Sequence, residues 1–127
     1  MPSLEDATHD FYDALNAVLG GDAEPMLTLW SHADDVTYMS PFGELLVGWE
    51  PVRASWHAQA GQRLGGRVDP AELRHFDSPS LGSVVGFERG SVQIEGTTTP
   101  VDIRATSTYR LEDGRWKMIG HHTDPLG

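Results

Sequence analysis

The feature that most constrains the fold is an alternation of side chains in segment 101–111. Its odd positions, from Val101 to Leu111, are mostly apolar, and its even positions are charged or threonine. Because successive strand residues point to opposite faces, this pattern predicts a strand with one face toward a core. The turn residues Glu112-Asp113-Gly114 follow and lead into a second strand over 116–123. The C-terminal part is therefore predicted to form an antiparallel hairpin.

Further strands are predicted on both sides of a helix. A short pair over 34–40 and 44–47 precedes it, and two long strands over 67–76 and 81–94 follow it. The first long strand is expected to be interrupted at Asp69-Pro70, because proline suits an edge or a bulge. The second is expected to end at a hairpin turn over 96–98.

Three helices are predicted, mainly from apolar spacing and from residues that begin or end helices. The first covers 3–19 and stops at Gly20-Gly21, the second covers about 23–30, and the third covers about 50–64. Helices followed by long antiparallel strands indicate an α+β fold in a single domain, 1–127. A long twisted sheet of this kind is expected to curl, and the helices or a ligand then fill its concave side.

Composition excludes several classes of function. The chain has 9 basic and 19 acidic side chains, a net charge of −10, and no cysteine. An acidic chain without a basic stripe argues against a nucleic-acid partner, and the lack of cysteine excludes disulfides and thiolate chemistry. No apolar window is long enough for a membrane span, and the N-terminus has no signal-peptide pattern. We therefore expect a cytoplasmic protein without a membrane partner.

Strand parity predicts a pocket. In the last strand Met118 and His122 share the parity of Trp116, and they are expected to face the same hollow as the odd residues of 101–111. Polar groups that converge in an apolar hollow are the usual sign of a ligand site. The expected pocket residues are Phe11, Tyr38, Ser40, Trp56, Ser107, Tyr109, Met118 and His122.

His122 is the predicted acid or base, because the pKa of histidine lies near neutrality. Asp124 is expected to orient it, and Tyr38 to polarise a ligand carbonyl. A purely structural role remains open for both residues. His122 could serve just to close the pocket, and Tyr38 could be a core residue. His121 and His122 alternate faces and should not ligate one ion, so neither a metal nor another cofactor is expected.

The sequence resembles the nuclear transport factor two-like superfamily and, within it, the SnoaL-like bacterial proteins. The stretches that carry the resemblance are 11–17, 30–38, 48–53 and 112–122. The resemblance implies a cone-shaped α+β barrel of the cystatin-like type, with a mixed, mainly antiparallel sheet packed against the three helices. It also implies a homodimer through the outer face of the sheet. Members include isomerases, dehydratases and association modules, so the fold does not settle the function.

Ketosteroid isomerase, one member of this superfamily, can be compared residue by residue. Its tyrosine, its aspartate base and its protonated aspartic acid correspond to Phe11, Ser40 and Ser107. Phenylalanine cannot donate a hydrogen bond, and serine is a poor base. The chain is therefore not expected to be a ketosteroid isomerase.

Two functions remain open on the sequence alone. The first is a domain that binds a small hydrophobic molecule in an apolar pocket and acts on a carbonyl compound as a cofactor-free isomerase, lyase or hydrolase. The alternative is a non-catalytic dimeric module for ligand binding or association. A pocket filled by the chain's own aromatic side chains would favour the alternative.

Overall fold

The computed structural model of the chain describes residues 2–41 and 43–126. In chain order its elements are α1 (Leu4–Leu19), α2 (Glu24–Leu29), β1 (Thr37–Met39), β2 (Leu45–Val47), α3 (Trp49–Gln62), β3 (Arg67–Asp77), β4 (Leu81–Ile94), β5 (Thr97–Glu112) and β6 (Arg115–Pro125). The predicted α+β class is confirmed, as are the three helices and the strand pair between the second and third of them. No helix of the described residues is long and apolar enough to cross a membrane.

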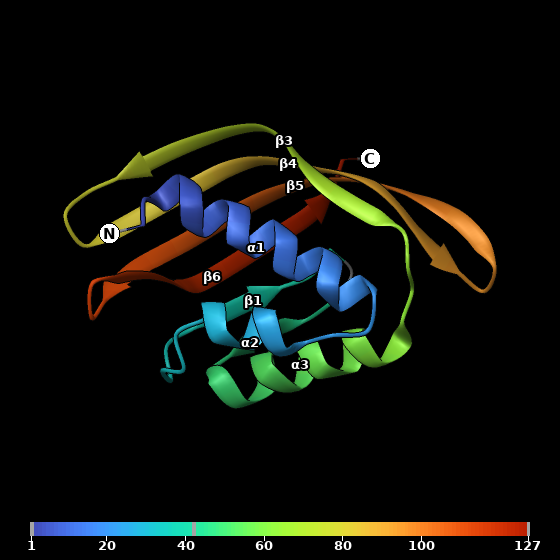
Figure 1. Cartoon of the computed structure of the whole chain (residues 1–127), viewed down its shortest axis with the longest axis horizontal. Coiled ribbons are helices and arrows are strands. Elements are labelled where there is room, and N and C mark those ends of the chain that lie inside the picture. The colour runs from blue at the N-terminus through green and yellow to red at the C-terminus, as the bar shows by residue number, and fades with distance from the viewer. Residues whose placement is uncertain (1, 42, 127) are drawn as a thin grey trace.

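The six strands form one sheet in the order β2-β1-β6-β5-β4-β3. β1 runs parallel to β6, and all other neighbours are antiparallel, so the sheet is mixed as expected. The sheet is curved but unclosed, with β2 and β3 at its edges. α1 lies across it in contact with β3, β4 and β6, while α3 contacts β1 and β2 (Figure 1).

α1 begins and ends where the sequence predicts. The Ser3 hydroxyl accepts a hydrogen bond from the Asp6 backbone N–H at 3.1 Å, and the Asp6 carboxylate accepts one from the Ser3 N–H at 3.0 Å. This reciprocal pair satisfies two N–H groups that the first turn leaves free. Gly20 caps the other end, and Gly21 follows with a φ of +104°. Both ends of the helix are thus fixed by local contacts that do not involve the sheet.

Several strand boundaries differ from the prediction. β1 is shorter than the expected 34–40, and β5 starts at Thr97 rather than at 101. The hairpin turn before β5 consists of Glu95 and Gly96, whose φ angles of +51° and +79° suit a tight two-residue turn. Thr97 and Thr98, which were predicted to belong to this turn, therefore begin β5.

β3 is interrupted slightly later than predicted. Pro70 stays paired with Glu88, and the break follows Ala71, where Glu72 and Leu73 lie opposite the single Gly86. Proline is tolerated here because β3 is an edge strand. A Cβ at Gly86 would lie 2.9 Å from the Ala71 backbone carbonyl oxygen, which cannot move aside as a side chain can, so the bulge requires glycine on the neighbouring strand.

β6 also contains a bulge, and this one changes which residues face the core. Met118 lies opposite Tyr109 and Gly120 lies opposite Thr108, so Ile119 is an extra residue between two consecutive partner positions. Such a bulge breaks the simple alternation of faces along a strand. After it, the buried histidine is His121.

The concave side of the sheet is filled by large side chains from the helices and strands. The fully buried ones include Phe11, Trp30, Trp56, Tyr109 and Met118. The rings contact one another closely: those of Tyr38 and Trp56 stack with centroids 4.7 Å apart. The hollow that strand parity predicted as a pocket is therefore a packed aromatic core in this structure.

Candidate functional site

Four polar side chains form a buried hydrogen-bonded chain in the core. They are Tyr12 from α1, Glu88 from β4, Ser107 from β5 and His121 from β6, which are 5, 3, 4 and 3 % exposed. The Tyr12 hydroxyl donates to Glu88 Oε2 at 2.9 Å, and His121 Nε2 lies 3.1 Å from the same oxygen. On the other side of the ring, His121 Nδ1 lies 2.8 Å from Ser107 Oγ. Hereafter these four residues are called the buried network.

The sheet register brings the members of the buried network together. Ser107 and His121 are direct partners across the β5–β6 ladder, and both point inward. Glu88 shares the inner face of β4 with Val84, which is also buried. A carboxylate on such an apolar face is costly unless it is paired, and here both Tyr12 and His121 contact it.

The geometry also sets the direction of the hydrogen bonds. Glu88, as a carboxylate, can only accept, so His121 donates through Nε2–H. In a neutral imidazole the other nitrogen then accepts, and Ser107 donates to Nδ1. Burial, with the neighbouring Glu88 carboxylate, raises the pKa of Tyr12 well above its ordinary value. Tyr12 therefore stays protonated and acts as a donor.

Aromatic rings surround His121. The Phe11 ring lies 4.6 Å from the imidazole by centroids, and the Tyr38 ring lies at 6.2 Å. The Tyr38 hydroxyl accepts a hydrogen bond from Gln59 Nε2 at 3.0 Å, and burial raises the pKa of Tyr38 to about 12. This environment keeps water away from the imidazole.

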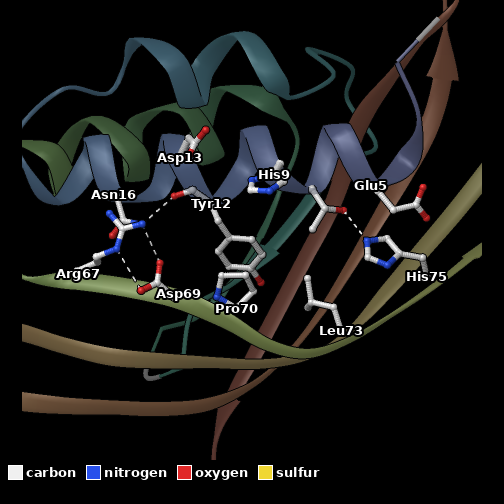
Figure 2. Close-up of a pocket in the computed structure, with 11 residues that line it drawn as sticks. Glu5, His9, Tyr12, Asp13, Asn16, Arg67, Asp69, Pro70, Leu73 and His75 are labelled. Carbon is white, nitrogen blue, oxygen red and sulfur yellow. Dashed lines mark hydrogen bonds and ion pairs between the residues drawn. The ribbon is translucent and has the colours of Figure 1, made fainter.

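A cavity of about 210 Å³ lies between α1 and β3, next to the buried network. Figure 2 shows the Tyr12 ring reaching from the helix toward the sheet, with Pro70 and Leu73 beside it. Tyr12 thus lines the cavity and also bonds to Glu88. The residues that line the cavity are Glu5, Thr8, His9, Tyr12, Asp13, Asn16, Arg67, Asp69, Pro70, Leu73 and His75.

Most polar groups of this cavity are already bonded. Asn16 ties α1 to β3, because its Nδ2 donates to the Val68 carbonyl at 2.8 Å and its Oδ1 accepts from the Val68 N–H at 2.9 Å. His75 Nε2 lies 3.2 Å from the Thr8 hydroxyl, and Arg67 is paired with Asp69 (Figure 2). The surface that lines the cavity is mainly apolar, and the exposed side chains of Glu5, His9 and Asp13 remain available to a ligand.

The structure brings six of the predicted site residues together in the interior. These are Phe11, Tyr38, Trp56, Ser107, Tyr109 and Met118. Of these, Ser107 belongs to the buried network, and the others pack around one another or around His121. Tyr109 also borders a second cavity, which is described below. Ser40 is only half-buried and lies at the turn after β1.

The predicted placement of His122 is wrong. The extra residue Ile119 changes the parity of β6, so His122 lies opposite Thr106 on the outer face of the sheet. Its Nε2 is 2.9 Å from Thr37 Oγ1, and it is half-buried. Burial, and to a lesser extent the neighbouring His121, lowers the pKa of His122.

Asp124 does not orient His122. Its carboxylate is ion-paired with Arg104 on the exposed face of the sheet. β6 continues through Asp124, but the aspartate lies opposite Arg104 of β5 and pairs with it rather than with His122.

Tyr12, Glu88 and His121 were not predicted as site residues from the sequence. Glu88 left a readable signal, because it has the same parity as Val84 and Val92 and is thus a lone carboxylate on an apolar face. His121 left none, since its orientation depends on the bulge. Among residues 2–41 and 43–126, no group of three or more histidine or carboxylate side chains is placed to hold a metal ion.

Comparison with known proteins agrees with this fold. A family model described as SnoaL-like domain matches residues 4–124. No curated protein matches the sequence. The chain is similar to a proposed calcium/calmodulin-dependent protein kinase type II association domain from Thiobacillus denitrificans, with 28% identity, a TM-score of 0.79, and coverage of 100% of this chain and 98% of the other.

Two further solved structures show the same fold at lower identity. One is a proposed dehydratase of the NTF2-like family from Streptomyces avermitilis, with 20% identity, a TM-score of 0.82, and coverage of 94% and 91%. The other is a proposed ketosteroid isomerase from Shewanella frigidimarina, with 15% identity, a TM-score of 0.74, and coverage of 93% and 91%. The family match spans nearly the whole chain, and the chain belongs to the SnoaL-like domain family.

Proposed function

We propose that the chain binds a small hydrophobic carbonyl compound in the α1–β3 cavity and moves a proton on it without a cofactor. The observation that carries this proposal is the position of Tyr12. Its ring lines the cavity, and its hydroxyl bonds to the buried Glu88. A ligand in the cavity can therefore contact a group that leads directly to a buried carboxylate. Solved structures of this fold include a proposed dehydratase and a proposed isomerase, which fits proton-transfer chemistry.

The proposed step is a proton relay. A C–H bond beside the ligand carbonyl breaks, and its proton passes to the Tyr12 oxygen as the Tyr12 proton passes to Glu88. The electron pair remains on the ligand as an enolate, and the reverse relay returns a proton. The transfer must be concerted, because the raised pKa of Tyr12 disfavours a free phenolate. His121 and Ser107 hold Glu88 in place from behind.

The test uses 1-indanone, a small aryl ketone, in heavy water. Proton NMR follows the loss of the hydrogens beside its carbonyl. The wild-type chain should accelerate this exchange over buffer, and Tyr12→Phe, which keeps the ring and removes only the hydroxyl, should lower it at least tenfold. Glu88→Gln should do the same.

The matched control is His122→Ala, on the outer face of the sheet, which should leave exchange unchanged. Circular dichroism checks that each variant is folded. Absence of acceleration by the wild-type chain, or full activity of folded Tyr12→Phe, would contradict the proposal. Loss of activity in His122→Ala would instead support the sequence-based assignment of the acid or base.

A second function, association with another copy through the sheet, is favoured by the outer sheet face. This face exposes apolar side chains at both ends: Val47 is 56% exposed on β2, and Phe76 is 59% exposed on β3. Arg89 and Arg104 on the same face are each paired with carboxylates. The face is therefore close to neutral, although the chain carries −10, so two copies can meet there with little repulsion.

The aromatic packing of the interior and the similarity to a proposed association domain also support this second function. Sedimentation equilibrium should give a dimer for the wild-type chain and a monomer for the double variant Val47→Asp, Phe76→Asp. Ile94→Asp is the control, because Ile94 is also exposed but lies on the other side of β4. A monomeric wild-type chain would exclude the dimer.

A further inference from the structure

A second cavity, of about 220 Å³, lies on the other flank of α1. It is bordered by α1, α2 and the turn-proximal part of the β5–β6 hairpin. None of its residues belongs to the buried network or lines the α1–β3 cavity. The residues that line it are Pro2, Ala7, Asp10, Thr28, Leu29, Tyr109, Arg115, Trp116 and Lys117.

Two cations without carboxylate partners border this cavity. Lys117 Nζ donates to the Thr28 carbonyl at 2.7 Å, and neither Lys117 nor Arg115 forms an ion pair with any described residue. The carboxylate closest along the β5–β6 ladder, Glu112, is already bonded to Arg110 and Ser31. Asp10 is the single acidic residue in the lining. The two cations of the lining outnumber its single carboxylate, so the cavity is positively charged although the net charge of the chain is −10.

The rest of the lining is mainly apolar. Leu29 and Trp116 supply apolar walls from α2 and β6. Tyr109 also borders the cavity, but its hydroxyl is fully buried and lies beside the Thr8 side chain, which lines the α1–β3 cavity instead. The Tyr109 ring is therefore a further apolar wall here, and its hydroxyl is not available to a ligand.

We infer that this cavity binds a small aryl or alkyl carboxylate that carries a single negative charge. The carboxylate pairs with Lys117 and Arg115, and the apolar body lies against Leu29 and Trp116. Asp10, in the α1 wall, repels a second negative charge, so monoanions are preferred over dianions. This inference is independent of the proposed function, because it involves a different cavity and other residues.

The test compares three probes of similar shape: phenylacetate, 2-phenylethanol and phenethylamine. Binding is followed through the Trp116 indole resonance, assigned with Trp116→Phe. Phenylacetate should perturb this resonance with saturation in the millimolar range, as expected for a fragment of this size, and should do so more weakly at high salt. The alcohol should bind at least tenfold more weakly, and the amine should not bind.

Variants locate the site. Lys117→Met with Arg115→Met should weaken phenylacetate binding at least tenfold. Arg53→Met, which removes an exposed cation of α3, is the matched control and should not change binding. Absence of binding by phenylacetate, equal binding of the acid and the amine, or unchanged binding in the double variant would overturn the inference.

Discussion

The two faces of the sheet use charge in opposite ways. On the inner face, the side chains of Glu88 and His121 are 4 and 3% exposed, and Glu88 Oε2 lies 3.1 Å from His121 Nε2 within the buried network. On the outer face, Arg104 and Asp124 are also paired, but their side chains are 58 and 54% exposed. Water already solvates the outer pair, whereas the inner groups depend on one another. Breaking an ion pair is therefore expected to cost much stability on the inner face of the sheet and little on the outer face.

The largest expected effect comes from removing the carboxylate of the inner face. Glu88→Ala leaves Tyr12 and His121 buried without their shared acceptor. We expect a loss of about 4 kcal/mol in the free energy of unfolding, as for other broken buried pairs. Urea unfolding followed by circular dichroism measures it. Arg104→Ala is the comparison on the outer face, and it should leave the unfolding midpoint unchanged. Equal losses in the two variants would contradict the contrast between the faces.

Alkaline ionisation of a single buried tyrosine, Tyr38, should remove nearly as much stability. All three tyrosines of the chain are buried, and burial raises the pKa of each, to about 12 for Tyr38. Above a pH of about 10 the unfolded chain loses phenolic protons that the folded chain keeps, so stability falls as pH rises from there toward 12. For Tyr38 alone the loss amounts to about 3 kcal/mol.

The measurement is absorbance at 295 nm, which reports phenolate. We expect no phenolate signal in the folded chain near pH 10, and a signal that rises together with unfolding at higher pH. Tyr38→Phe should move the alkaline transition to higher pH. Ionisation of one or more tyrosines near pH 10 without loss of structure would show that those rings are accessible in solution.

A smaller loss is expected from Ser107→Ala. The variant removes the donor to His121 Nδ1 but leaves Glu88 bonded to His121 and Tyr12. The cost should be about 1 kcal/mol, because one buried acceptor loses its partner. Urea unfolding gives this value. Thr106→Ala, one residue earlier and on the outer face of β5, is the matched control and should cost less.

Most of the fold could be predicted from the sequence, because its signals are local. The capping pair of Ser3 and Asp6 and the alternation over 101–111 each depend on a few neighbouring residues. The inner placement of Ser107 and Tyr109 followed from that alternation and is confirmed.

The orientation of the two histidines could not be predicted in this way. Nothing in the residues of 116–123 marks Ile119 as an extra residue. Its bulge exists because Met118 must cover the core opposite Tyr109, while Gly120 pairs with Thr108 beside Thr37 of β1. The β1 part of that requirement comes from a strand distant in sequence. The site was therefore misplaced by one residue although the strand itself was right.

The smallest expected effect concerns His122, the outer neighbour of His121. Because burial lowers its pKa in the folded chain, the unfolded chain binds a proton more readily. The stability linked to neutral His122 is thus present above a pH of about 6.5 and is lost as pH falls through the lower pKa of the folded chain. His122→Asn cannot titrate, so wild-type and variant chains should differ in melting temperature by a constant amount above pH 7, and the wild-type chain should lose more below pH 6. Melting curves between pH 5 and 8 measure the difference. A wild-type chain that becomes relatively more stable on acidification would mean that His122 gains an acidic partner in solution, and the outer face would then resemble the inner one.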